Sequence, residues 1–76
     1  MTNETEKKIL NAALNVFAKK GRDAATTKAI AEKAGRTEMT LFRKFGTKKN
    51  LFEMVMIQNM EKMKEDIESI IKDLDN

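Results

Sequence analysis

The chain has 76 residues, no cysteine and no histidine, and it carries 15 Lys and Arg residues against 12 Asp and Glu residues. This length fits one small domain with a single apolar core and leaves no room for a second domain with a small-molecule pocket. Without cysteine or histidine, a disulfide framework is excluded, and neither a metal site nor enzymatic catalysis is expected. We therefore expect a protein that is not an enzyme and that needs no cofactor.

The charge is divided unevenly along the chain. Residues 1–49 contain 12 Lys and Arg against 5 Asp and Glu, whereas residues 50–76 contain 3 against 7, so the two parts carry +7 and −4. A basic half joined to an acidic half suggests that the first half meets a polyanion such as nucleic acid. Charge alone leaves solvated helix surfaces as an equally good explanation.

No membrane or secretion signal is evident. No apolar run approaches the roughly 18 residues that a membrane-spanning helix needs. The first residues, Met1 to Glu4, lack the basic and apolar regions of a signal peptide. A cytoplasmic protein without a membrane partner is expected.

The first expected helix covers residues 4–20. Its cap would be Thr2 or Asn3, and Gly21 would end it. Its apolar residues recur at helical spacing and are Ile9, Leu10, Ala13, Leu14 and Phe17.

Two short helices are expected next, over residues 27–34 and 38–45. Thr26 or Thr27 would cap the earlier one, whose apolar residues are Ile30, Ala31 and Ala34. The later one would follow Thr37, pair Leu41 with Phe45 in the core and end at Gly46. Only Gly35, Arg36 and Thr37 separate the two helices, which is the short, glycine-containing connection of a helix-turn-helix.

A long fourth helix is expected from Thr47 nearly to the end of the chain. Its first part would face back onto the shorter helices through Leu51, Phe52, Met54 and Val55. Its second part has apolar residues at alternating spacings of four and three, which is the seam of a coiled coil or of a helix packed on another helix. The seam residues are Met56, Met60, Met63, Ile67, Ile70 and Leu74. This distal seam needs a partner.

Four ordered segments together resemble the amino-terminal domain of the tetracycline-repressor (TetR) family. They are Ile9-Leu10-Asn11-Ala12-Ala13-Leu14 with Phe17, Ala18 and Gly21, then Ile30-Ala31-Glu32-Lys33-Ala34-Gly35, then Thr40-Leu41-Phe42-Arg43-Lys44-Phe45, then Lys48 and Leu51. The resemblance covers about residues 5–57. Each segment is weak by itself, but the ordered set with its spacings is specific.

The resemblance implies that the third helix enters the major groove of DNA, with contacts from the starts of the second and fourth helices. The positions that it implies are Thr27, Lys28, Thr37, Glu38, Met39, Thr40, Phe42, Arg43, Lys44 and Lys48. Arg43 and Lys44 would project to the flanks of the third helix, where guanidinium can read guanine and ammonium can bind phosphate.

Other readings of these residues stay open. Lys48 lies at the positive end of its helix, where its own positive charge is unfavourable, and a DNA phosphate would relieve this repulsion. An exposed lysine can also avoid the repulsion by extending into water. Thr27 is also a possible cap, and Thr40 a plain surface residue. The negative charge of Glu38 stabilises the positive end of its helix, and this structural role is the preferred interpretation. The carboxylate can also accept a hydrogen bond from cytosine N4.

Three residues depart from the family pattern. Arg36 stands where a small apolar residue is common and can add a phosphate contact. Phe42 replaces the usual tyrosine and removes a hydroxyl donor. Met39 replaces a small residue and can contact a thymine methyl group.

We therefore expect an all-α chain with a three-helix, homeodomain-like helix-turn-helix head followed by a long fourth helix. Residues 1–62 would form the DNA-binding domain, with the helix-turn-helix at about 26–45. Residues 63–76 would lead to a missing ligand-binding and dimerisation domain, so the chain would be a fragment or an unusually short natural protein. The expected partner is double-stranded DNA, with a palindromic operator and a homodimeric full-length parent that acts as a repressor.

Two alternatives belong to other classes. A small helical module could use the Met/Ile seam to bind another protein. An amphipathic helix could instead lie on a membrane surface, but the acidic tail argues against this because anionic lipids attract Lys and Arg.

Overall fold

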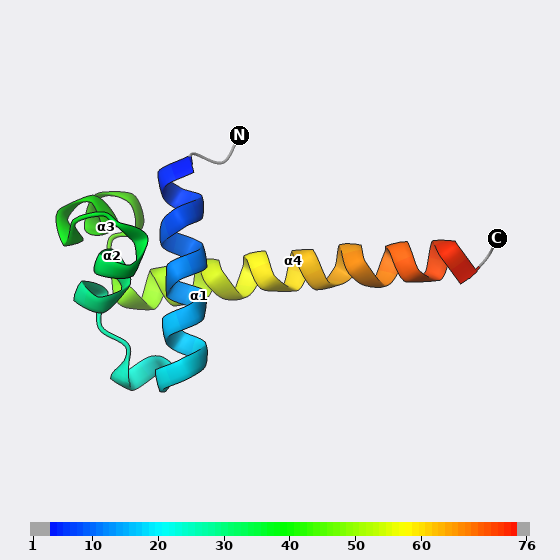
Figure 1. The fold of residues 1–76 in the computed structure, drawn as a ribbon, viewed down its shortest axis with the longest axis horizontal. Helices are drawn as coiled ribbons and strands as arrows, with labels where there is room; N and C mark the ends of the chain where they lie inside the picture. Colours follow the sequence, from blue (N-terminus) through cyan, green and yellow to red (C-terminus); the bar gives the residue numbers. More distant parts are fainter. Residues whose placement is uncertain (1–3, 75–76) are drawn as a thin grey trace.

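The computed structural model describes residues 4–74 and shows four helices and no strand in this range. The helices are α1 (Glu4–Ala24), α2 (Thr27–Ala34), α3 (Glu38–Phe45) and α4 (Lys48–Leu74). In Figure 1, α1 crosses the first part of α4, α2 and α3 lie beside this crossing, and the rest of α4 extends away from it. The predicted all-α class is confirmed. The predicted cap at Thr2 or Asn3 lies outside the described residues.

Threonine side chains cap the starts of α2, α3 and α4. In each case the hydroxyl oxygen accepts a hydrogen bond from the backbone N–H three residues later. The capping residues are Thr26, Thr37 and Thr47, at 3.1, 3.2 and 3.0 Å. Of the two candidates for the cap of α2, Thr26 therefore has this role, and Thr27 is the first helical residue.

Glycines with positive φ end the helical runs. Gly21 has φ 81 and ψ 166, so the regular part of α1 stops there as predicted, and only a short helical segment follows it to Ala24. Gly35 has φ 71 and ψ 31, the left-handed conformation, and its N–H closes the end of α2 on Ala31 and Glu32 carbonyl oxygens. These two backbone conformations set the turns on either side of α2.

One fully buried side chain from each helix forms the centre of the core. These side chains are Ile9, Ile30, Leu41 and Leu51. Phe17 and Val55 extend the core along α1 and α4. Because every helix contributes to one apolar cluster, burial fixes how α3 sits on the other helices.

Two expected core residues lie at the surface instead. Leu14 of α1 is 40% exposed and Met54 of α4 is 41% exposed, while Ala12 and Val16 of α1, which were not among the expected core residues, are buried. The buried face of α1 is turned toward the small side chains because α1 packs against both α2 and α4. Leu14 and Met54 line depressions at the edges of the α1–α4 contact.

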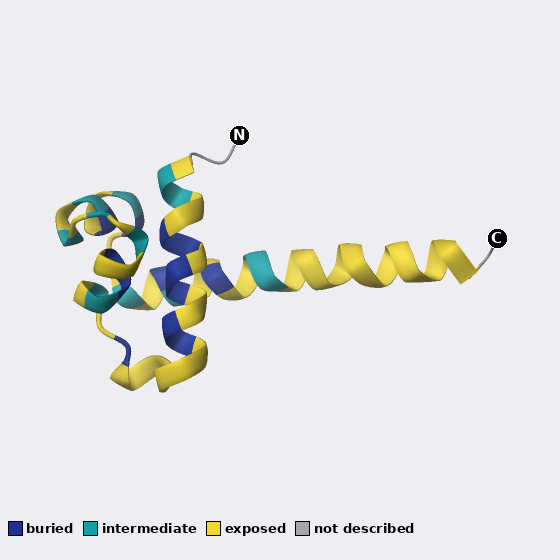
Figure 2. Ribbon diagram, in the orientation of Figure 1, coloured by how far each residue is buried: buried dark blue, intermediate teal, exposed yellow. Residues whose placement is uncertain are grey.

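The distal half of α4 has no cover within the described chain. All residues from Met60 to Leu74 are exposed, and Figure 2 shows this stretch in the exposed colour. The exposed fractions of the seam residues lie between 42% at Met56 and 80% at Leu74. No helix within residues 4–74 combines the length and the apolar character that crossing a bilayer requires.

Asparagine substitutions at Gly21 and Gly35 test the backbone argument. Asparagine tolerates the left-handed conformation of Gly35, so Gly35→Asn should lower the free energy of unfolding by less than about 1 kcal/mol. The conformation of Gly21 is essentially restricted to glycine, so Gly21→Asn should lower it by about 1 to 3 kcal/mol. A Cβ atom at either position meets nothing within 4 Å, so steric clashes do not confuse the comparison. Urea unfolding measures both values, and equal losses would contradict the argument.

Candidate nucleic-acid interface

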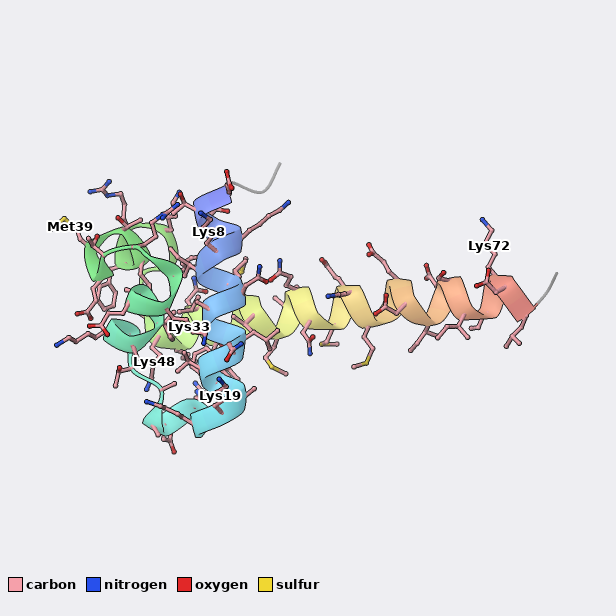
Figure 3. The ribbon with its side chains drawn as sticks, viewed as in Figure 1. Lys8, Lys19, Lys33, Met39, Lys48 and Lys72 are labelled. Atoms are coloured by element: carbon pink, nitrogen blue, oxygen red, sulfur yellow. The ribbon has the colours of Figure 1, made fainter. Side chains whose placement is uncertain are left out.

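Helix α3 buries one face and exposes the opposite one. Leu41 and Phe45 are buried, whereas Met39 is 70% exposed and Arg43 is exposed. At 3.6 residues per turn, Met39 and Arg43 lie one turn apart and nearly opposite to the buried pair. Figure 3 shows Met39 projecting from the outer edge of α3, away from the distal end of α4. This face of α3 therefore has no cover within residues 4–74.

The start of α3 is held by hydroxyl groups. Thr37 accepts from the backbone N–H of Thr40, and the hydroxyl oxygens of the two threonines lie 3.0 Å apart, within hydrogen-bond distance. Both predicted site residues therefore have a structural role in the first turn of α3. Neither hydroxyl is buried, so each remains accessible to a phosphate oxygen.

Thr27 and Glu38 join the starts of α2 and α3. The Thr27 hydroxyl donates a 2.9 Å hydrogen bond to Oε2 of Glu38, and both residues are half-buried. Glu38 also lies in the first turn of its helix, where a carboxylate is favourable. The structure therefore gives Glu38 a clear structural partner, which the sequence could not identify.

Lys48 bonds back to the segment that precedes α2. Its ammonium group donates a 3.1 Å hydrogen bond to the carbonyl oxygen of Ala25, a buried residue. The unfavourable position of a lysine at a positive helix end is thus relieved within the protein. Lys49 is exposed and makes no comparable contact within the described chain.

Arg43 and Lys44 point in different directions, although the sequence placed both on the flanks of α3. Arg43 lies on the exposed face with Met39. Lys44 forms a 3.7 Å ion pair with Glu6 of α1, and its side chain is only 23% exposed. The difference arises because Glu6, near the start of α1, lies within reach of Lys44, which periodicity within α3 does not reveal. A partly exposed ion pair of this kind contributes little stability, so Lys44 can exchange Glu6 for another anion.

The remaining predicted residues lie around this face. Arg36 is half-buried and donates from Nη1 to the Gly35 carbonyl oxygen at 3.0 Å. Phe42 is 42% exposed, so its ring is not part of the buried core. Lys28 is exposed and makes no hydrogen bond or ion pair within the described chain.

Two residues that make contacts between helices, Asn50 and Arg22, were not identified from the sequence. The Asn50 side chain donates a 2.7 Å hydrogen bond to the Phe45 carbonyl oxygen and so ties the end of α3 to α4. Arg22 lies 4.8 Å from the centre of the Phe52 ring, which also meets Phe17 edge to face at 5.1 Å. No local motif signals these contacts, because most of them join residues far apart in the chain.

A shallow depression of about 380 Å³ lies between α1 and α4. Asn11, Leu14, Val55 and Gln58 are among its lining residues. It lies at the α1–α4 crossing, and none of the predicted DNA-contacting residues lines it.

Lys48→Met and Lys49→Met form a matched pair of variants. Both remove a charge from the positive end of α4, but only Lys48→Met removes a hydrogen bond to Ala25. We expect Lys48→Met to be less stable than Lys49→Met by about 1 kcal/mol. Chemical unfolding of the two variants measures this difference, and indistinguishable stabilities would show that the Lys48 contact contributes nothing.

Comparison with known proteins agrees with this geometry. Residues 9–55 match the model of the bacterial regulatory proteins of the tetR family. The uncharacterized HTH-type transcriptional regulator YvkB of Bacillus subtilis (strain 168) is 49% identical over 55 residues, which cover 72% of this chain and 29% of that protein. The matched part thus spans less than a third of the relative's length. This chain belongs to the tetR family of bacterial regulatory proteins, and the matched residues contain its helix-turn-helix.

Proposed function

We propose that this chain is the DNA-reading domain of a bacterial transcriptional regulator and that α3 enters the major groove of double-stranded DNA. The observation that carries the proposal is the two-sided character of α3, which buries Leu41 and Phe45 and exposes Met39 and Arg43. The major groove, about 12 Å wide, admits one α-helix. The family assignment supports the same use of this helix.

Base recognition is assigned to the exposed face of α3. Arg43 can donate two hydrogen bonds to O6 and N7 of guanine, and Met39 can make apolar contact with a thymine methyl group. Both side chains project from the same face one helical turn apart, so they would meet neighbouring base pairs.

Phosphate contacts are assigned to the polar residues around that face. They are Thr27, Lys28, Arg36, Thr37, Thr40, Lys44 and Lys48. Lys28 can bind a phosphate without giving up an internal contact. Lys44 and Lys48 would exchange Glu6 and the Ala25 carbonyl for DNA, at modest expense because both are partly exposed.

A longer protein that contains this domain is proposed to be a cytoplasmic repressor. The matched part of the chain covers only 29% of the B. subtilis relative, so a protein of that length would have room for a further domain that dimerises and binds an effector. A homodimer would place two α3 helices on a palindromic operator. No catalytic role, cofactor or small-molecule pocket is assigned to this chain, nor any membrane contact.

A second candidate function rests on the exposed seam of α4. Side chains from Met56 to Leu74 form an uncovered apolar stripe, which suits a helix-binding module. Affinity for duplex DNA, compared with affinity for an amphipathic helical peptide, separates the two functions.

Arg43→Ala and Lys28→Ala should weaken DNA binding in different ways. Arg43→Ala should lose about 1 to 3 kcal/mol and relax preference at one base pair. Lys28→Ala should weaken all sequences alike and reduce the slope of log affinity against log salt by about 1. Binding titrations with single-substituted duplexes at several salt concentrations provide both readouts. Uniform losses for both variants would reassign Arg43 to the phosphate backbone, and salt-independent binding would exclude the DNA function.

Phe42→Tyr should strengthen DNA binding. The ring is 42% exposed, so the added hydroxyl stays hydrated in the free protein, and stability should change by less than about 0.5 kcal/mol. On DNA the hydroxyl should donate to a phosphate and add about 1 to 2 kcal/mol for every sequence. Melting temperature and DNA affinity are measured on the same sample. A large drop in melting temperature without tighter binding would remove Phe42 from the phosphate-facing surface.

A further inference from the structure

The contact between Thr27 and Glu38 brings a carboxylate to the surface that is proposed to face DNA. Thr27 is the first residue of α2 and Glu38 is the first residue of α3. Their 2.9 Å hydrogen bond is the only one between side chains of α2 and α3 in residues 4–74. Both residues are half-buried, and the hydrogen bond to Thr27 restricts where the carboxylate lies in the free protein.

The charge of Glu38 is out of place in this part of the chain. Residues 25–49 contain seven Lys and Arg residues and two carboxylates, Glu32 and Glu38. Glu32 is exposed on α2, whereas Glu38 lies on α3 itself, one residue before Met39. A carboxylate at this position meets the electrostatic field of DNA phosphates in any complex that α3 makes.

The hydrogen bond adds a second effect. A threonine hydroxyl has one proton to donate, and in the free protein Thr27 donates it to Glu38. The same proton is therefore withheld from a DNA phosphate. The repulsion between Glu38 and the DNA phosphates acts at the same place as the retention of the Thr27 proton by Glu38, which we call donor retention. Neither effect depends on the base sequence.

We propose that Glu38 weakens binding to DNA of every sequence by about the same factor, so that phosphate contacts alone give only a weak complex. This inference rests on the proposed DNA-binding function. Contacts of Arg43 and Met39 with a correct site offset the effect of the carboxylate, whereas a complex held only by phosphate contacts has nothing to offset it. Glu38 thus lowers background binding and leaves recognition to the bases.

Glu38→Gln tests the proposal, because the amide keeps the shape of the side chain and an oxygen that can accept from Thr27. We expect this variant to bind a duplex of random sequence about fivefold more tightly than the wild type at low salt. Glu38→Asp keeps the charge and should give no gain. Glu68→Gln makes the same change in net charge on distal α4, roughly 30 Å along the helix from Lys48, and should also give no gain. Circular dichroism melting checks that all variants fold.

The role of Thr27 is tested by combining Glu38→Ala with Thr27→Val, because Glu38→Ala removes the acceptor of the Thr27 proton as well as the charge. If donor retention contributes, the gain from Glu38→Ala is smaller in the Thr27→Val background, and equal gains in both backgrounds would overturn that part. If the wild type binds DNA and the Glu38→Gln variant binds it equally tightly or more weakly, the inference is overturned and the proposed function stands. If neither protein binds any duplex, both fail.

Discussion

The structure depends on one apolar contact in which all four described helices take part. Ile9, Ile30, Leu41 and Leu51 are fully buried and come from α1, α2, α3 and α4 respectively. Leu41 belongs to a helix of only 8 residues, which would not be stable alone, so its burial both forms α3 and orients it. The exposed face of α3 is a consequence of this contact, because burial of Leu41 directs the side chains on the opposite side of the helix toward solvent.

Polar contacts then adjust the surface that the core creates. Thr37 caps α3, Asn50 ties its end to α4, and Lys48 links the start of α4 to Ala25. Several of the side chains proposed to bind DNA thus already have partners in the free protein. Binding would exchange these partners for phosphates, and the balance of that exchange sets affinity without altering the fold.

The helices were predictable because their limits are encoded locally. Helix α3 begins after Thr37 and ends before Gly46, as predicted from the sequence, because caps and positive-φ glycines act over a few residues. The site was only partly predictable. The Thr27–Glu38 hydrogen bond and the Lys44–Glu6 ion pair join different helices, so they depend on packing that periodicity does not reveal. The same limit explains why Leu14 was wrongly placed in the core: its spacing fits the stripe, but the buried face of α1 is turned by its two neighbours.

The central claim is that the outer face of α3 meets DNA. Nuclear magnetic resonance mapping of backbone amides during titration with a short duplex tests it most directly. We expect the largest shifts from Arg36 to Lys44 and at the starts of α2 and α4, while amides from Met60 to Leu74 stay unchanged. Shifts confined to distal α4, with α3 unaffected, would contradict it.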